Sequence, residues 1–179
     1  MAGLPRALPA WIAPPVFFGV ALALYLSGLR NPLMFDDGHL QEWALRERYA
    51  DAYLRFASRW VSDTTFSWVY SAFGYSIPAQ RVFNMVAHAA AASALFVFAT
   101  RLGTLVAQEA RARWLALAGA LVFVVHPVAV YAVGYLIQRS IVLATLFSVL
   151  ALLCVLEALA AQSRRSAAGW YAEIGRAHV

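Results

Sequence analysis

The stretch that decides the fold class is "IVLATLFSVLALLCVLEALAA", residues 141–161, in which Glu157 is the only charged residue. A helix of about 20 apolar residues crosses the hydrocarbon core of a bilayer. Three further apolar runs lie before this stretch in the chain, and they predict spanning helices at about 11–29, 82–100 and 114–133. We therefore expect an all-α, polytopic membrane protein with about four transmembrane helices.

The composition supports a membrane protein and argues against other classes. Hydrophobic residues make up 63% of the chain and charged residues only 13%, against about 25% charged residues in an average soluble domain. All 14 basic residues are arginines that lie scattered between the apolar runs, so we predict no nucleic-acid partner. The single cysteine, Cys154, excludes an internal disulfide framework.

The arginines also predict the orientation. Short connections rich in arginine face the cytoplasm. Here they alternate with other connections, of which the long one at 30–80 also carries five arginines, but its six acidic residues balance them. The arginines of the predicted cytoplasmic side are Arg6, Arg101, Arg111, Arg113, Arg164 and Arg165. Residues 30–80 and the connection at 126–140 are then expected outside.

The outer loop, residues 30–80, is too long for a simple connector. Apolar residues near helical spacing predict one amphipathic helix over residues 40–61, lying on the membrane surface. Its expected interfacial anchors are Trp43, Tyr49, Tyr53 and Trp60. A second short helix is expected at "DTTFSWVYSAF", residues 63–73.

Two adjacent aspartates, Asp36 and Asp37, stand in "NPLMFDDGHLQ", where the first apolar run has ended. Asp-Asp-Gly suits a solvated turn that simply stops a helix. Alternatively, the pair is catalytic, because partial burial would raise the pKa of one carboxyl and leave a base beside an ionised neighbour. His39 is so close in sequence that the three residues are weak evidence for a metal site, and we predict neither metal nor cofactor.

Two further groups of polar residues lie in or beside the apolar runs. Asn84 and His88 share one helix face and either fix helix packing or line a cavity. In "HPVAVYAVGYLIQRS", residues 126–140, Pro127 should end or kink the third helix. Arg139, beside Gln138, either extends its side chain to lipid headgroups or binds the phosphate of a lipid-linked substrate.

Three stretches resemble one family, in the same order and on the same predicted topology. They are "FDD" at 35–37, "TTFSWVYSAFGYSIPAQRVFNMVAH" at 64–88 and "FVVHPVAVYAVGYLIQRSIVLATLF" at 123–147. They are similar to the membrane domain of the GT-C glycosyltransferases that precede tetratricopeptide (TPR) arrays. This group comprises the bacterial tetratricopeptide-repeat membrane proteins and the transmembrane-and-TPR O-mannosyltransferases. The likeness covers residues 32–153.

The resemblance implies an enzyme that moves a sugar from a polyprenyl-phosphate donor to an exterior acceptor, a protein Ser/Thr hydroxyl. It implies a multi-pass protein of the bacterial inner membrane, with the catalytic loop facing the periplasm. Its partners would be the lipid-linked sugar, membrane lipid and a protein or glycan acceptor. The residues implied are the catalytic Asp36 and Asp37, with Asp36 favoured as general base, the phosphate-binding Arg139, His126 and Gln138, and the supporting Asn84 and His88.

The chain also departs from that family. Arg81 stands where the family often has histidine, and Val130-Tyr131 replaces the usual Thr-Glu or Thr-Gln. A GT-C membrane domain has seven or more spans, so we expect residues 1–172 to be a truncated GT-C module that is inactive as a fragment. The last seven residues, "EIGRAHV" at 173–179, match the translation of a sequencing adapter, and we expect read-through there.

Two rival hypotheses remain open. A transporter fragment or a non-catalytic scaffold would place paired charges at mid-depth or would use discontinuous helices, whereas most charges here lie at the predicted outer face. A related GT-C enzyme acting on lipid A or on a polysaccharide would share the same membrane domain.

Overall fold

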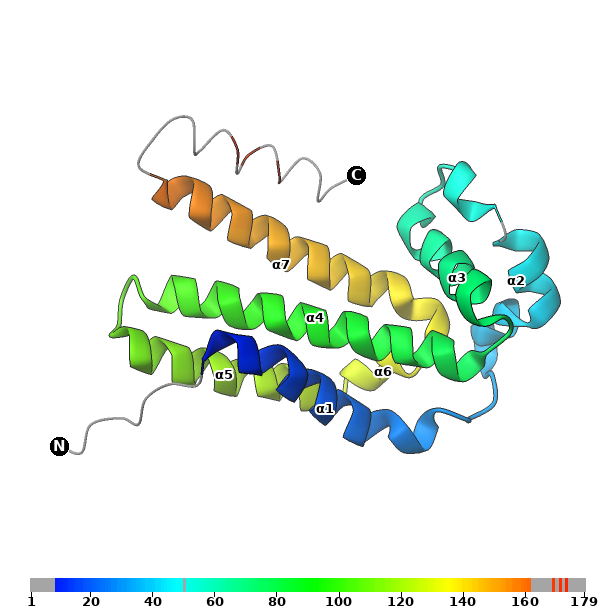
Figure 1. The fold of residues 1–179 in the computed structure, drawn as a ribbon, viewed down its shortest axis with the longest axis horizontal. Coiled ribbons are helices and arrows are strands. Elements are labelled where there is room, and N and C mark those ends of the chain that lie inside the picture. The colour runs from blue at the N-terminus through cyan, green and yellow to red at the C-terminus, as the bar shows by residue number, and fades with distance from the viewer. Residues whose placement is uncertain (1–8, 50, 162–168, 170, 172, 174–179) are drawn as a thin grey trace.

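The computed structural model describes residues 9–49, 51–161, 169, 171 and 173, and its regular structure there is helical throughout (Figure 1). The longer helices are α1 (Ala13–Tyr25), α3 (Trp60–Phe73), α4 (Ile77–Gly103), α5 (Glu109–Val125) and α7 (Arg139–Ala160). The short ones are η1 (Ala10–Ile12), η2 (Leu26–Gly28), η3 (Phe35–Leu40), α2 (Glu42–Arg48), η4 (Ala52–Leu54), α6 (Ala129–Val133) and η5 (Leu136–Gln138). The predicted all-α class is confirmed. The expected read-through segment, 173–179, lies outside the described residues apart from Glu173.

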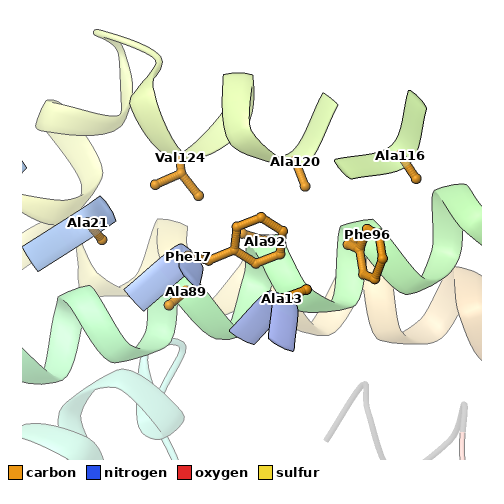
Figure 2. Close-up of a cluster of buried hydrophobic side chains, with 9 residues drawn as sticks. All are labelled: Ala13, Phe17, Ala21, Ala89, Ala92, Phe96, Ala116, Ala120 and Val124. Carbon is orange, nitrogen blue, oxygen red and sulfur yellow. The ribbon is translucent and has the colours of Figure 1, made fainter. Parts of the chain in front are cut away.

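Helix α4 is the centre of an elongated bundle and contacts α1, α5 and α7 (Figure 1). Figure 2 shows the packing of α1, α4 and α5, in which Phe17 of α1 lies among alanines of the other two helices. Its ring meets that of Phe96 edge-on, with the centroids 6.2 Å apart. Small residues let helix backbones approach closely, so Ala92 and Ala120 make room for the two aromatic rings.

Two helical segments of the described chain, Ile77–Gly103 and Leu136–Ala160, are long and apolar enough to cross a membrane by length and composition. Ala13–Gly28 is apolar but shorter, and α5 has 17 residues. The structure therefore favours membrane association through α4 and α7. It does not confirm the four predicted spans.

The helix at the predicted third span, 114–133, has other bounds than that span, and it ends before Pro127 as predicted. Helix α5 begins earlier, at Glu109, and ends at Val125. The next residue, His126, has the extended conformation φ −63°, ψ 129°, which the ring of Pro127 imposes on the residue before it. The chain then turns into the separate short helix α6.

The outer loop is helical, but it does not form the predicted single amphipathic helix over 40–61. It is divided into η3, α2 and η4 before α3, which begins three residues earlier than predicted. Tyr49 is not an interfacial anchor, because it is buried with Leu40, Leu45 and Phe66 of the same loop and Leu136 of η5. Helix α2 lies beyond the end of the bundle at which α4 and α7 begin, whereas α3 lies beside the first turns of α7 (Figure 1).

Candidate functional site

Asp37 joins the outer loop to the start of α7. Its carboxylate is 2% exposed and accepts two backbone hydrogen bonds, from the N–H of Leu136 to Oδ2 (3.1 Å) and from the N–H of Ile137 to Oδ1 (2.8 Å). Nearly a hundred residues separate the partners in sequence. Asp37 thus holds η3 against η5, the turn that precedes α7.

Burial raises the pKa of Asp37 above its usual value of 3.8, and the nearby charge of Asp36 raises it further. The two N–H donors and the guanidinium of Arg81 oppose this shift but do not cancel it. The native state therefore holds a proton on this carboxyl more tightly than the unfolded chain does.

This shift predicts a pH dependence that can be measured against Asp37→Asn. Because the folded protein binds this proton more tightly, protonation of Asp37 stabilises the fold. This stabilisation is fully present below pH 3.8, the pKa of the unfolded chain, and is lost as the pH rises through the pKa of the folded protein. Lowering the pH from about 7 to about 4 should therefore raise the melting temperature of the wild type relative to that of Asp37→Asn. Thermal unfolding of both proteins in one detergent would measure the difference, and a gap that stayed constant or moved the other way would contradict the prediction.

Asp36 lies beside Asp37 in sequence but is exposed. Its backbone N–H donates to the hydroxyl of Tyr135 (3.0 Å). Asp36 lines two neighbouring clefts. One, of about 680 Å³, also holds Arg81 and Tyr135, and the other, of about 320 Å³, holds Arg59 and Gln138.

Phe35, directly before the two aspartates, has an unusual backbone conformation. It has φ +52° and is 87% exposed, and a bulky residue in this left-handed region is strained by about 1–3 kcal/mol. Such strain next to a carboxylate is typical of functional sites.

Arg139, the predicted phosphate ligand, is fully buried. Its Nε donates to Asn84 Oδ1 (2.7 Å), Nη1 to Thr65 Oγ1 (3.3 Å), and Nη2 to the backbone O (2.9 Å) and Oε1 (2.8 Å) of Gln80. The rings of Phe66 and Phe83 lie 3.8 and 4.5 Å from the guanidinium carbon. Residues of α3 and α4 thus enclose the guanidinium, and it lines neither of the clefts beside Asp36. In this structure Arg139 links α3, α4 and α7.

The two predicted histidines share a different cavity. His88 is buried, with Nε2 3.4 Å from the backbone O of Val124 and its ring 4.9 Å from that of Phe123. His126 is exposed, and its Nδ1 accepts the N–H of Val128 (3.3 Å). Both line a mainly apolar cavity of about 270 Å³ among α4, α5, α6 and α7.

The seven predicted site residues therefore fall into three groups. Asp36, Asp37 and Gln138 lie around the two clefts, Asn84 lies with Arg139 in the buried cluster, and His88 lies with His126. Helix α6 contributes residues both to the larger cleft and to the histidine cavity. In the described part of the chain, no three His, Cys, Asp or Glu residues are grouped as a metal site would require.

Sequence reasoning missed Arg81 and Tyr135 at the larger cleft. Arg81 donates from Nη1 to the backbone O of Leu29 (3.0 Å) and of Asn31 (2.6 Å), and from Nη2 to that of Pro32 (3.2 Å). It thereby fixes the chain just before the two aspartates. Arg81 could have been singled out from the sequence, because it stands where the family often has histidine. No local pattern indicated Tyr135.

Comparisons of this chain with protein-family models, with curated proteins and with solved structures found no match.

Proposed function

We propose that this chain is part of a GT-C membrane glycosyltransferase, of the kind found in bacterial tetratricopeptide-repeat membrane proteins and transmembrane-and-TPR O-mannosyltransferases. It would transfer a sugar from a polyprenyl-phosphate donor to an exterior acceptor, a protein Ser/Thr hydroxyl. The proposal rests on the three sequence blocks. The single structural observation that carries it is that the exposed residue Asp36 lines both clefts.

In the proposed reaction, Asp36 takes the proton from the acceptor hydroxyl. The acceptor oxygen then forms a bond to the anomeric carbon as the bond between that carbon and the phosphate oxygen breaks, and polyprenyl phosphate leaves. Asp37 serves as the anchor that holds Asp36 in place. The two clefts give the donor and the acceptor separate approaches to one carboxylate.

The departing phosphate needs hydrogen-bond donors or positive charge. Of the residues predicted for this role, His126 is exposed and Gln138 lines the smaller cleft. Because Arg139 is enclosed, we propose that it holds α3 and α7 in place and does not contact the phosphate in this conformation. Arg59 and Arg81 are the arginines that line the clefts.

We further propose that α1, α4, α5 and α7 all cross a bacterial inner membrane. Seventeen residues of α5 span about 26 Å, slightly less than the roughly 30 Å hydrocarbon core. Arg101 and Glu157 form an ion pair (3.0 Å) between the far ends of α4 and α7. This pair would mark the cytoplasmic end of the bundle, opposite Asp36.

The function is tested with the full-length product of the gene in membranes supplied with a labelled polyprenyl-phosphate sugar. Label on protein that is lost after β-elimination, which cleaves sugars from Ser and Thr, supports the proposal. Label on lipid A or on a polysaccharide would assign the acceptor of the rival GT-C enzyme. No transfer from a range of polyprenyl-phosphate sugars would favour a scaffold or a transporter.

The topology gives a further prediction. In a Cys154→Ala background, a cysteine at Gly38 should react with a membrane-impermeant reagent in intact cells, and a cysteine at Gln108 should react only after the cells are opened. The reason is that the arginines near Gln108 hold that end in the cytoplasm. Labelling of Gln108→Cys but not Gly38→Cys in intact cells would overturn the orientation and the catalytic proposal.

A further inference from the structure

Residues 53–60, between η4 and α3, present apolar side chains outward. Leu54 is 68% exposed, Phe56 is 83% exposed, and Tyr53 is also exposed. The segment is braced from within, because Nε1 of Trp60 donates to the backbone O of Tyr53 (3.1 Å) and the Phe56 ring stacks on the Trp60 ring with the centroids 5.0 Å apart. The exposed side chains are therefore held in a defined arrangement.

The start of α3 lies alongside the spanning helices, below their outer ends. Val61 packs against a cluster formed by Ala87 of α4 and by Val142 and Leu143 of α7. Leu143 lies about one turn into α7, and Figure 1 shows α3 beside the beginning of that helix. The segment that leads directly into Val61 is consequently near the depth of the outer lipid boundary.

The charges of the segment fit the same boundary. Arg55 lies between Leu54 and Phe56 in sequence, and it is largely exposed while paired with Asp51 (2.6 Å). Arginine side chains next to apolar anchors extend their charged ends to the phosphate level of a bilayer. Exposed aromatic and apolar residues on both sides of such an arginine are the arrangement that an interfacial segment needs.

We propose that residues 53–60 insert into the outer leaflet of the membrane, with Leu54 and Phe56 among the upper acyl chains and Arg55 at the phosphates. This inference rests on the proposed membrane placement and not on sugar transfer. A second copy of the chain is the less suitable partner. Three exposed apolar side chains make a patch much smaller than the roughly 1,200–2,000 Å² that stable protein interfaces bury.

The test uses the whole chain, with Cys154→Ala, in vesicles of phosphatidylcholine and phosphatidylglycerol. An environment-sensitive fluorophore is attached to Phe56→Cys, and lipids carrying a nitroxide near the headgroup or near the tail end act as quenchers. Leu152→Cys, on the exposed face of α7, is the deep control, and Glu47→Cys, an exposed position of α2, is the aqueous control.

We expect the label at position 56 to emit at shorter wavelength than the label at 47 and to be quenched several-fold more by the shallow nitroxide than by the deep one. The label at 152 should be quenched by the deep nitroxide, and the label at 47 only by aqueous iodide. A label at 56 that behaved like the label at 47, with 152 still quenched from the lipid, would overturn this inference and leave the membrane placement intact.

Two other results would also overturn it. If the lipid nitroxides did not quench the label at 152, the proposed membrane placement would be contradicted, and so would this inference, which depends on it. If the label at 56 were shielded from both iodide and lipid nitroxides, and this shielding disappeared when fewer protein copies were placed in each vesicle, the patch would belong to a contact between copies.

Discussion

Asp36→Asn should reduce sugar transfer by the full-length enzyme by at least about a hundredfold, because loss of a general base typically costs 10²–10⁴-fold in rate. The substitution keeps the size of the side chain and removes its charge. It does not touch the bond from the Asp36 backbone N–H to Tyr135, so the turn should persist. Transfer of labelled sugar in membranes, measured at matched expression, gives the rate.

Two controls accompany this variant. Asp37→Asn should cost less activity, because Asp37 contacts the backbone of η5 and serves to hold the loop. Glu47→Gln removes an exposed carboxylate of α2 and should leave transfer unchanged. If Asp36→Asn and Asp37→Asn both transferred sugar at near wild-type rates, the pair would be only a turn that stops a helix.

Arg139→Ala should lower the free energy of unfolding by about 3–5 kcal/mol, since it opens a cavity and leaves buried polar groups unpaired. The groups left without their partner would be Asn84 Oδ1, Gln80 Oε1 and Thr65 Oγ1, while Phe66 and Phe83 would lose the guanidinium between them. Thermal or denaturant unfolding in detergent gives the change in stability.

The matched control for this variant is Arg113→Ala. Arg113 pairs with Glu109 across one turn of α5, and the glutamate side chain is largely exposed. Such pairs contribute at most about 1 kcal/mol. Arg139→Lys should not restore stability, because one ammonium group cannot replace a planar guanidinium that bonds in several directions and stacks on rings. An Arg139→Ala protein as stable as Arg113→Ala would show that the buried cluster contributes little, and would reopen direct phosphate binding by Arg139.

The sequence by itself determined the helical class and the places of the two longest helices. Both follow from local properties: long apolar runs form helices wherever their backbone groups cannot bond to water, and Pro127 forces a break in whatever helix precedes it. The sequence also determined that the two aspartates follow the first apolar run, because this depends only on the order of residues along the chain. Hydrophobicity alone could not set the ends of α5 or divide the outer loop, where burial of Tyr49 overrides the helical spacing.

Only the tertiary structure decided how neighbouring residues differ. Asp36 and Asp37 have the same side chain and almost the same position in sequence, yet one lines two clefts and the other is buried. The difference comes from Leu136, Ile137 and Tyr135, which lie about a hundred residues away. Arg139 likewise turns inward because residues of α3 and α4 supply its acceptors. Burial and hydrogen bonding depend on such distant partners, and no local pattern in the sequence specifies which of them will meet.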